Sequence, residues 1–257
     1  MNLLPHTDPT LRLLHVEESF VVVDKPAGLL AVPGRGEAGQ QHLAGRVQAA
    51  LPDALVVHRL DMATSGLMLF ARGADMQRRL SAMFEARAID KQYIAVVHGD
   101  IAGDSGVIDL PIGADWPNRP RQRVDHEQGK PACTRWQVLQ RQVDSGAAGA
   151  ATGTRLALQP VTGRTHQLRV HLAAIGHSIV GDALYGPAYL PRDVSSDDPR
   201  DDRNDDRSDD PSDDPSDVPL NSPTDRPRPR LLLHATMLGF AHPLHGGDCR
   251  FDSPAPF

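Results

Sequence analysis

His58-Arg59-Leu60-Asp61-Met62-Ala63-Thr64-Ser65-Gly66 runs directly into the apolar residues Leu67-Met68-Leu69-Phe70, and this stretch organises the rest of the chain. The apolar run predicts a buried strand over residues 66–71. Asp61 lies just before that strand, between an arginine and a Thr-Ser-Gly turn. A carboxylate at such a position is poorly placed for simple solvation. We therefore expect it to be held, ionised, as a nucleophile or base in a cleft.

The other periodic segments predict more strands than helices. Strands are expected at residues 19–23, 92–97, 136–139, 155–159 and 231–240. Helices are expected at residues 40–51 and along the apolar stripe of Met76, Leu80, Met83 and Phe84. A third helix is expected to open with Thr162-Gly163-Arg164-Thr165, to place Leu168, Leu172 and Ile175 on one face, and to end at Gly176. Because strands and helices do not alternate regularly, the pattern favours an α+β fold with a largely antiparallel sheet.

Composition limits the class of protein. The chain has 257 residues, of which 40% are hydrophobic, so it can bury a core as one large domain or two small ones. No apolar run is long enough for a bilayer, and no signal segment opens the sequence. Cys133 and Cys249 lack metal-ligand or disulfide spacing, which predicts a reducing cytoplasm and no metal site.

The net charge of −6 is dominated by an acidic insertion at residues 192–230, so it does not describe the rest of the chain. Between Asp193 and Asp217 twelve aspartates face three arginines, so this segment carries −9 and the remainder of the chain +3. Three Ser-Asp-Asp-Pro repeats and the scarcity of apolar side chains predict disorder. A tolerated loop expansion is the simpler interpretation, and an acidic arm that competes with RNA for a basic cleft is the alternative.

Asp61 taken alone admits a simpler interpretation, as a carboxylate that caps a turn through Thr64 or Ser65. An aspartic protease would place Thr/Ser-Gly directly after the aspartate, whereas Met62 and Ala63 intervene here. An aspartyl-phosphate enzyme would need further carboxylates for magnesium. The histidines do not indicate a metal site either, because His166 and His171 are five residues apart and fall on different faces of a helix.

Several ordered motifs favour a catalytic role for Asp61 over a turn cap, because together they resemble the RluA family of pseudouridine synthases. They are residues 58–66, Asp24-Lys25-Pro26-Ala27-Gly28-Leu29, Lys91-Gln92-Tyr93, residues 163–171 (GRTHQLRVH), Gly181-Asp182 with Tyr185-Gly186, and Leu231-Leu232-Leu233-His234-Ala235. The resemblance covers roughly residues 12–190 and 230–257. It implies one catalytic domain over residues 1–257, with a bent, largely antiparallel mixed sheet, flanking helices and a central cleft.

The resemblance also assigns roles. Asp61 is implied as the nucleophile or electrostatic stabiliser at the sugar C1′, Arg164 as its cationic partner, and Tyr93 as the aromatic that stacks on uracil and acts as a base at C5. Arg59 is implied as the side chain that fills the gap left by a flipped-out uridine. Further candidates for RNA contact are His58, Thr64, Arg35, Arg119, Arg121, Arg123 and Arg169.

A narrower resemblance concerns the target. Residues 32–35 (VPGR), Met62-Ala63 and residues 115–120 (DWPNRP) are similar to members that lack the S4 RNA-binding domain and modify both a 23S rRNA hairpin and tRNA anticodon stem-loops. We therefore expect a stand-alone, monomeric enzyme that needs no cofactor. The alternatives are a family member with one RNA target, and a catalytically silent RNA-binding or chaperone protein that uses the same cleft.

Overall fold

The computed structural model describes residues 11–34, 37–144, 152–187 and 230–257, so most of the predicted insertion lies outside the described residues. The strands are β1 (Arg12–Val16), β2 (Phe20–Lys25), β3 (Ala54–Val56), β4 (Ser65–Arg72), β5 (Asp90–His98), β6 (Ser105–Asp109), β7 (Ile112–Ala114), β8 (Gln122–Val124), β9 (Cys133–Asp144), β10 (Thr152–Pro160), β11 (Leu233–Ala241) and β12 (Asp248–Asp252). The helices are α1 (Leu43–Ala50), α2 (Gly73–Glu85) and α3 (Gln167–Ala174), with short 3₁₀ turns η1 (Glu37–Gln40) and η2 (Trp116–Asn118).

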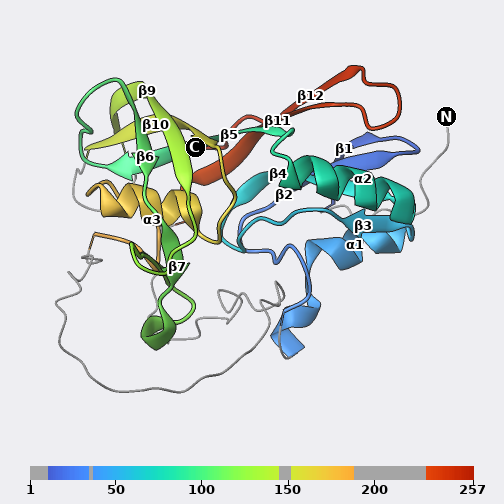
Figure 1. Ribbon diagram of the computed structural model, residues 1–257, viewed down its shortest axis with the longest axis horizontal. Coiled ribbons are helices and arrows are strands. Elements are labelled where there is room, and N and C mark those ends of the chain that lie inside the picture. Colours follow the sequence, from blue (N-terminus) through green and yellow to red (C-terminus); the bar gives the residue numbers. More distant parts are fainter. Residues whose placement is uncertain (1–10, 35–36, 145–151, 188–229) are drawn as a thin grey trace.

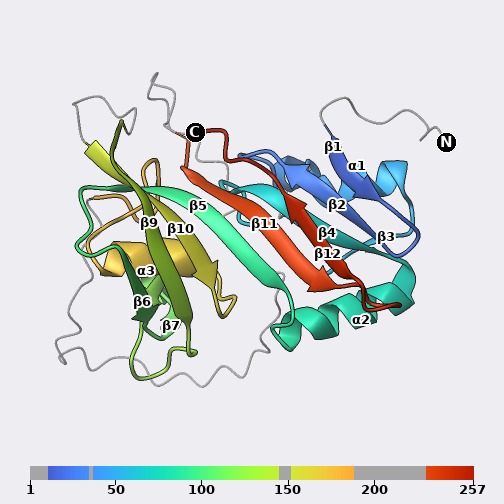
Figure 2. The same cartoon turned by 90° about the horizontal axis from the view of Figure 1, so that it is seen from above.

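One mixed sheet runs through the molecule in the order β1-β2-β4-β11-β5-β10-β9-β6, with β3 on β4 and β12 on β11 as branches. Every recorded strand pair is antiparallel except β4 with β11, which is parallel. Two halves are visible, with α1 and α2 beside β1–β4 and α3 beside β9 and β10 (Figure 1). Figure 2 shows β5 and β11 crossing the middle between them. The α+β, largely antiparallel prediction is confirmed.

The apolar run at β4 is explained by helices that cover both faces of the sheet. Met68 and Phe70 pack in one cluster with Val47 of α1. Leu67 and Leu69 point to the opposite face and join a cluster that contains Leu80 of α2. Because successive side chains of a strand alternate between faces, burial on both faces requires an uninterrupted apolar sequence. The strand predicted from this run is therefore central to the sheet.

The second half of the sheet packs against α3, and here the predicted boundaries need correction. Leu168 and Leu172 of α3 lie in a core cluster with strands β5, β10 and β11, as the apolar spacing predicted. However, α3 begins at Gln167, so Arg164 lies in the turn before the helix rather than on it. The helix predicted at 40–51 is also shorter, because α1 begins at Leu43 after His42 caps it through Gly45 N–H.

The parallel pairing of β4 with β11 brings the C-terminal part of the chain against the Asp61 loop. Gly66 is partnered with Ala235 and has φ of +114°. A Cβ at this position would lie 2.2 Å from the Ala235 carbonyl oxygen, so only glycine fits. The glycine that ends the opening motif thus permits the close strand contact that fixes the loop before it.

Candidate active site

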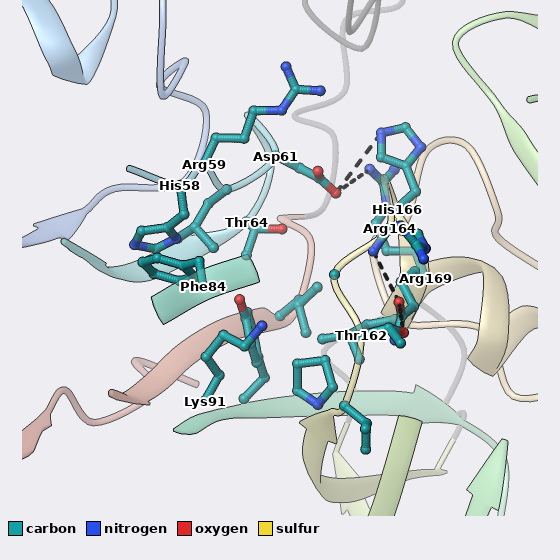
Figure 3. A pocket seen from close by; sticks show the side chains of 18 of the residues that line it. His58, Arg59, Asp61, Thr64, Phe84, Lys91, Thr162, Arg164, His166 and Arg169 are labelled. Atoms are coloured by element: carbon teal, nitrogen blue, oxygen red, sulfur yellow. Dashed lines mark hydrogen bonds and ion pairs between the residues drawn. The ribbon is translucent and has the colours of Figure 1, made fainter. Parts of the chain in front are cut away.

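A cleft of about 550 Å³ lies between the two halves of the molecule (Figure 3). Its walls come from the loop between β3 and β4, the end of α2, strand β5, and the segment from the end of β10 into α3. All three residues that the sequence assigned to catalysis line it, together with Arg59, His58, Thr64 and Arg169. Segments far apart in the sequence therefore converge at the predicted site.

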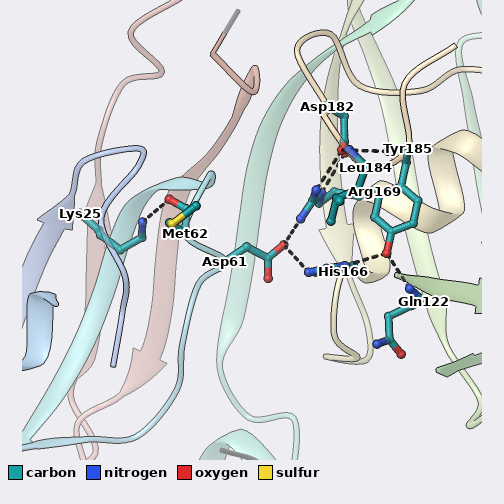
Figure 4. Close-up of polar contacts among 9 residues, drawn as sticks. All are labelled: Lys25, Asp61, Met62, Gln122, His166, Arg169, Asp182, Leu184 and Tyr185. Atoms are coloured by element: carbon teal, nitrogen blue, oxygen red, sulfur yellow. Dashed lines mark hydrogen bonds and ion pairs between the residues drawn. The ribbon is translucent and has the colours of Figure 1, made fainter. Parts of the chain in front are cut away.

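Asp61 is the carboxylate around which the cleft is built. Its Oδ2 accepts a hydrogen bond of 3.1 Å from Arg169 Nη1 and lies 4.0 Å from His166 Nε2 (Figure 4). Burial alone would raise the pKa of Asp61, but the neighbouring His166 and Arg169 outweigh it and hold the pKa below its ordinary value. The carboxylate is therefore ionised at neutral pH, as the sequence suggested.

The cationic partner of Asp61 is Arg169, which corrects the assignment of Arg164. The Arg164 guanidinium donates instead to the Pro131 carbonyl oxygen at 3.1 Å, on the wall of the same cleft. Arg169 had been a candidate for RNA contact, yet only 4% of it is exposed. Because its guanidinium is buried and already pairs with Asp61 and Asp182, Arg169 is poorly placed to contact an RNA phosphate.

Asp182 holds Arg169 in place from the other side. Its two carboxylate oxygens accept from Arg169 Nε at 2.8 Å and Nη2 at 2.9 Å, a two-pronged pair that fits a planar guanidinium. The same carboxylate also accepts from the backbone N–H groups of Leu184 and Tyr185. Arg169 is thereby oriented so that its remaining nitrogen faces Asp61.

Tyr93 enters the cleft from β5, as its motif implied. Burial, and secondarily the negative charge of Asp61, raise the pKa of Tyr93 well above its ordinary value. The residue is therefore a neutral phenol at pH 7 in the resting site. This favours stacking and hydrogen-bond donation over action as a preformed base.

Lys25 anchors the Asp61 loop from behind. The side chain is fully buried, and its ammonium donates to the carbonyl oxygens of Leu29 at 2.7 Å, Pro26 at 3.0 Å and Met62 at 3.0 Å. The Met62 carbonyl also accepts from Gly28 N–H at 2.8 Å. The peptide next to Asp61 is thus tied to the turn after β2.

We expect Lys25→Met to destabilise the fold by about 2–4 kcal/mol, because buried carbonyl oxygens lose their charged donor. Urea unfolding measures the change in free energy. The control is Arg78→Met, which removes an exposed cation from α2 and should change stability by less than about 0.5 kcal/mol. Equal effects of the two substitutions would contradict the anchoring role.

His58 has a structural environment within the cleft wall. Its Nε2 accepts from Leu69 N–H at 2.9 Å, and its ring stacks on Phe84 with centroids 4.5 Å apart. Burial, and secondarily Lys91, lower the pKa of His58 to about 3. Thr64 is 2% exposed and donates its backbone N–H to the Asp61 carbonyl oxygen. Both residues therefore shape the loop as well as lining the cleft.

The lowered pKa of His58 predicts a pH dependence of stability. The unfolded chain takes up a proton near pH 6.5 and the folded chain only near pH 3, so stability decreases as pH decreases below 6.5. We expect His58 to lower the free energy of unfolding by about 1–2 kcal/mol when the pH is decreased from 7 to 5. In His58→Gln, whose amide oxygen can accept from Leu69 N–H without titrating, unfolding free energies at the two pH values should differ less. An unchanged difference would contradict the assignment.

The arginines expected to contact RNA occupy different places. Arg59 lies beside Asp61 at the mouth of the cleft (Figure 3). Arg119 is exposed and its guanidinium lies 3.5 Å from the ring centroid of Trp116, which is 67% exposed. Arg123 pairs with Asp125 at 3.1 Å. Arg35 lies outside the described residues.

His166, Asp182 and Tyr185 are site residues whose roles the sequence analysis missed. They fall inside quoted motifs, but a motif does not state which side chain faces which partner. The sequence excludes His166 from a metal site without giving it a partner, and the structure places it beside Asp61. The backbone of His166 has a φ of +53°, which is unusual for a residue other than glycine, and it turns the chain into α3.

The described part of the chain contains no group of three or more His, Cys, Asp or Glu side chains placed to hold a metal ion. None of the helices in these ranges is long and apolar enough to cross a membrane.

Comparison with known proteins identifies the family. Residues 19–174 match the model of RNA pseudouridylate synthases, and the chain belongs to that family of isomerases. The mixed sheet with its central cleft is thus the α+β pseudouridine synthase fold.

Individual relatives extend the match to the whole chain. The "Dual-specificity RNA pseudouridine synthase RluA" of Salmonella typhi is 40% identical over 256 residues, covering 100% of this chain and 98% of that protein. The protein of the same name from Vibrio vulnificus is 50% identical over 182 residues, covering 71% of this chain and 72% of the relative. The solved structure of human RNA pseudouridylate synthase domain containing 1 is 26% identical with a TM-score of 0.68, covering 96% of this chain and 84% of that one.

Proposed function

We propose that this protein converts uridine to pseudouridine in two kinds of RNA, a 23S rRNA hairpin and tRNA anticodon stem-loops, as a monomer in the cytoplasm. Dual specificity is supported by relatives that carry this description in their names and align over nearly their full length. The observation that carries the activity is Asp61, held ionised between Arg169 and His166 in a cleft that also contains Tyr93.

The isomerisation requires one carboxylate and involves no net oxidation or reduction. The N1–C1′ bond of uridine breaks, the uracil turns, and C5 forms a bond to C1′ while C5 loses a proton and N1 gains one. Asp61 supports this by adding to C1′ as uracil departs and leaving again when C5 attacks. A second route uses the same carboxylate to remove a proton from C2′. Both routes require Asp61 to be ionised.

Tyr93 and Arg59 have complementary roles in the proposal. C1′ and C5 are inaccessible in a stacked stem-loop, so the target uridine has to leave the stack. Tyr93 offers its ring to the flipped uracil. When Asp61 forms an ester with C1′ its charge is lost, and one contribution to the raised pKa of Tyr93 disappears. Arg59, at the mouth of the cleft, fills the space that the nucleotide leaves.

Mapping of pseudouridines in total RNA from a deletion strain tests the proposed targets. We expect the modification to disappear from one 23S rRNA hairpin and from tRNA anticodon loops, and to return with the wild-type gene but not with Asp61→Asn. Loss from a single RNA class would replace dual specificity with the single-target alternative. An unchanged map would favour a silent RNA-binding protein.

A further inference from the structure

A chain of three contacts joins Asp61 to a hairpin arm, residues 112–124, that comprises β7, η2 and β8 (Figure 4). The Gln122 backbone N–H donates to Tyr185 Oη at 2.7 Å. Tyr185 Oη lies 2.7 Å from His166 Nδ1, and His166 Nε2 lies 4.0 Å from Asp61 Oδ2. Tyr185 is completely buried and His166 is 3% exposed, so both are held by packing.

The contacts of this series favour a hydrogen on the His166 nitrogen that faces Asp61, because the opposite neutral tautomer would turn the Nε2 lone pair toward a carboxylate. Burial raises the pKa of Tyr185, so it remains a phenol that can donate its hydroxyl hydrogen. If the imidazole is neutral, a Tyr185 hydroxyl that donates to Nδ1 leaves the ring hydrogen on Nε2. If the imidazole is charged, both nitrogens carry hydrogen. In both states an N–H group faces the Asp61 carboxylate, which is the favourable arrangement.

The separation of 4.0 Å is too long for a hydrogen bond, and a movement of about 1 Å would form one. Contacts of this kind often tighten only when substrate is bound. The opposite end of this series of contacts lies on the arm, whose ribbon extends away from the large sheet (Figure 1). The arm carries Trp116 and Arg119, and both residues are exposed. A nucleic acid bound to the arm would therefore shift β8, whose Gln122 N–H donates to Tyr185 Oη.

We propose that His166 and Tyr185 are positioning residues that transmit RNA contact on the arm to Asp61, by bringing His166 Nε2 into hydrogen-bond distance of the carboxylate. This inference rests on the proposed function. It gives Asp61 two donors in the loaded enzyme, Arg169 held by Asp182 and His166 held by Tyr185. Both donors lie on the same side of Asp61 (Figure 4), and His166 is the one that contacts the Tyr185 hydroxyl to which Gln122 of the arm donates.

Tyr185→Phe tests the chain, because it removes one hydroxyl and leaves the ring packed against His166 and Arg169. We expect the single-turnover rate at saturating RNA to decrease about 10- to 100-fold, with the Kd for RNA unchanged. The acid limb of the pH–rate profile should also move to higher pH, because the donor that favours ionised Asp61 is no longer fixed. A saturating rate within twofold of wild type would overturn the proposal.

A double-mutant cycle tests transmission from the arm. Arg119→Ala should weaken RNA binding and lower the saturating rate in wild type, but in Tyr185→Phe it should weaken binding without lowering the rate further. Independent, multiplicative effects on the rate would contradict the link. Thr154→Val is the matched control, because it removes a buried hydroxyl bonded to the Gly99 carbonyl oxygen, remote from the cleft, and should leave the rate unchanged.

A second pair of variants keeps the test decisive if Tyr185→Phe fails to fold. His166→Gln retains an N–H donor near the Nε2 position and should preserve more of the saturating rate than His166→Leu, with equal Kd values for RNA. Equal rates for the two would overturn the proposal. Absence of pseudouridine with the wild-type protein would instead refute the proposed function itself.

Discussion

Asp61→Asn is expected to lower the rate of pseudouridine formation by at least about 10⁴-fold, because the amide cannot add to C1′ or remove a proton. The fold should persist. Arg169 keeps its two-pronged contact with Asp182, and the substitution removes a partly buried charge without changing shape. RNA binding should also persist, since a carboxylate next to a phosphate-rich ligand does not contribute attraction.

The measurements are carbodiimide-dependent primer extension for pseudouridine and a mobility-shift assay for RNA affinity. Asp53→Asn provides the control, because it neutralises an exposed carboxylate in the turn before β3 that pairs with Arg72 and does not line the cleft. It should retain wild-type activity. Activity surviving in Asp61→Asn would remove Asp61 from the mechanism.

Arg169→Met is expected to have the second largest effect, because one guanidinium serves two carboxylates. Asp182 is fully buried and would lose its charged partner, which costs about 3–5 kcal/mol when a buried pair is broken from one side. Asp61 would lose a donor that lowers its pKa. The pKa of Asp61 should rise, so the acid limb of the pH–rate profile should shift to higher pH and the rate at pH 7 should decrease at least 100-fold.

Arg164→Met distinguishes the two arginines. It removes the same charge from the same cleft, but Arg164 contacts the Pro131 carbonyl oxygen and not Asp61. We expect a smaller loss of rate and an acid limb in its wild-type position. Urea unfolding and pH–rate profiles of both variants provide the comparison. If the acid limb shifts in Arg164→Met but not in Arg169→Met, the cationic partner of Asp61 is Arg164, as the family resemblance implied, and not Arg169.

The central elements of the fold could be predicted because their sequence patterns are caused by burial. The continuous apolar run at β4 arises from helices on both faces, and the stripe of α2 from one buried side, where Met76 and Leu80 are buried. Short strands leave weaker patterns. β7 and β8 have three residues each and form a separate two-stranded sheet, which contacts Tyr185 through the Gln122 N–H.

The candidate site was predicted to the level of segments, not of partners. Asp61 and Tyr93 are where the motifs placed them, but the turn from residue 162 to 166 decides which arginine reaches the carboxylate. Gln167 fixes that turn, since its side chain accepts from Thr162 Oγ1 and Arg164 N–H while donating to the Cys133 carbonyl oxygen. Such long-range contacts between a turn and a strand have no signature in a single sequence.

The measurement that tests the account most directly uses the purified full-length protein with two RNA transcripts, a 23S rRNA hairpin and a tRNA anticodon stem-loop. Each is incubated with wild type or Asp61→Asn, digested to nucleosides and analysed by mass-resolved chromatography. We predict pseudouridine in both transcripts with wild type and in neither with Asp61→Asn. Absence of pseudouridine from both wild-type reactions, or its presence with Asp61→Asn, would contradict the account.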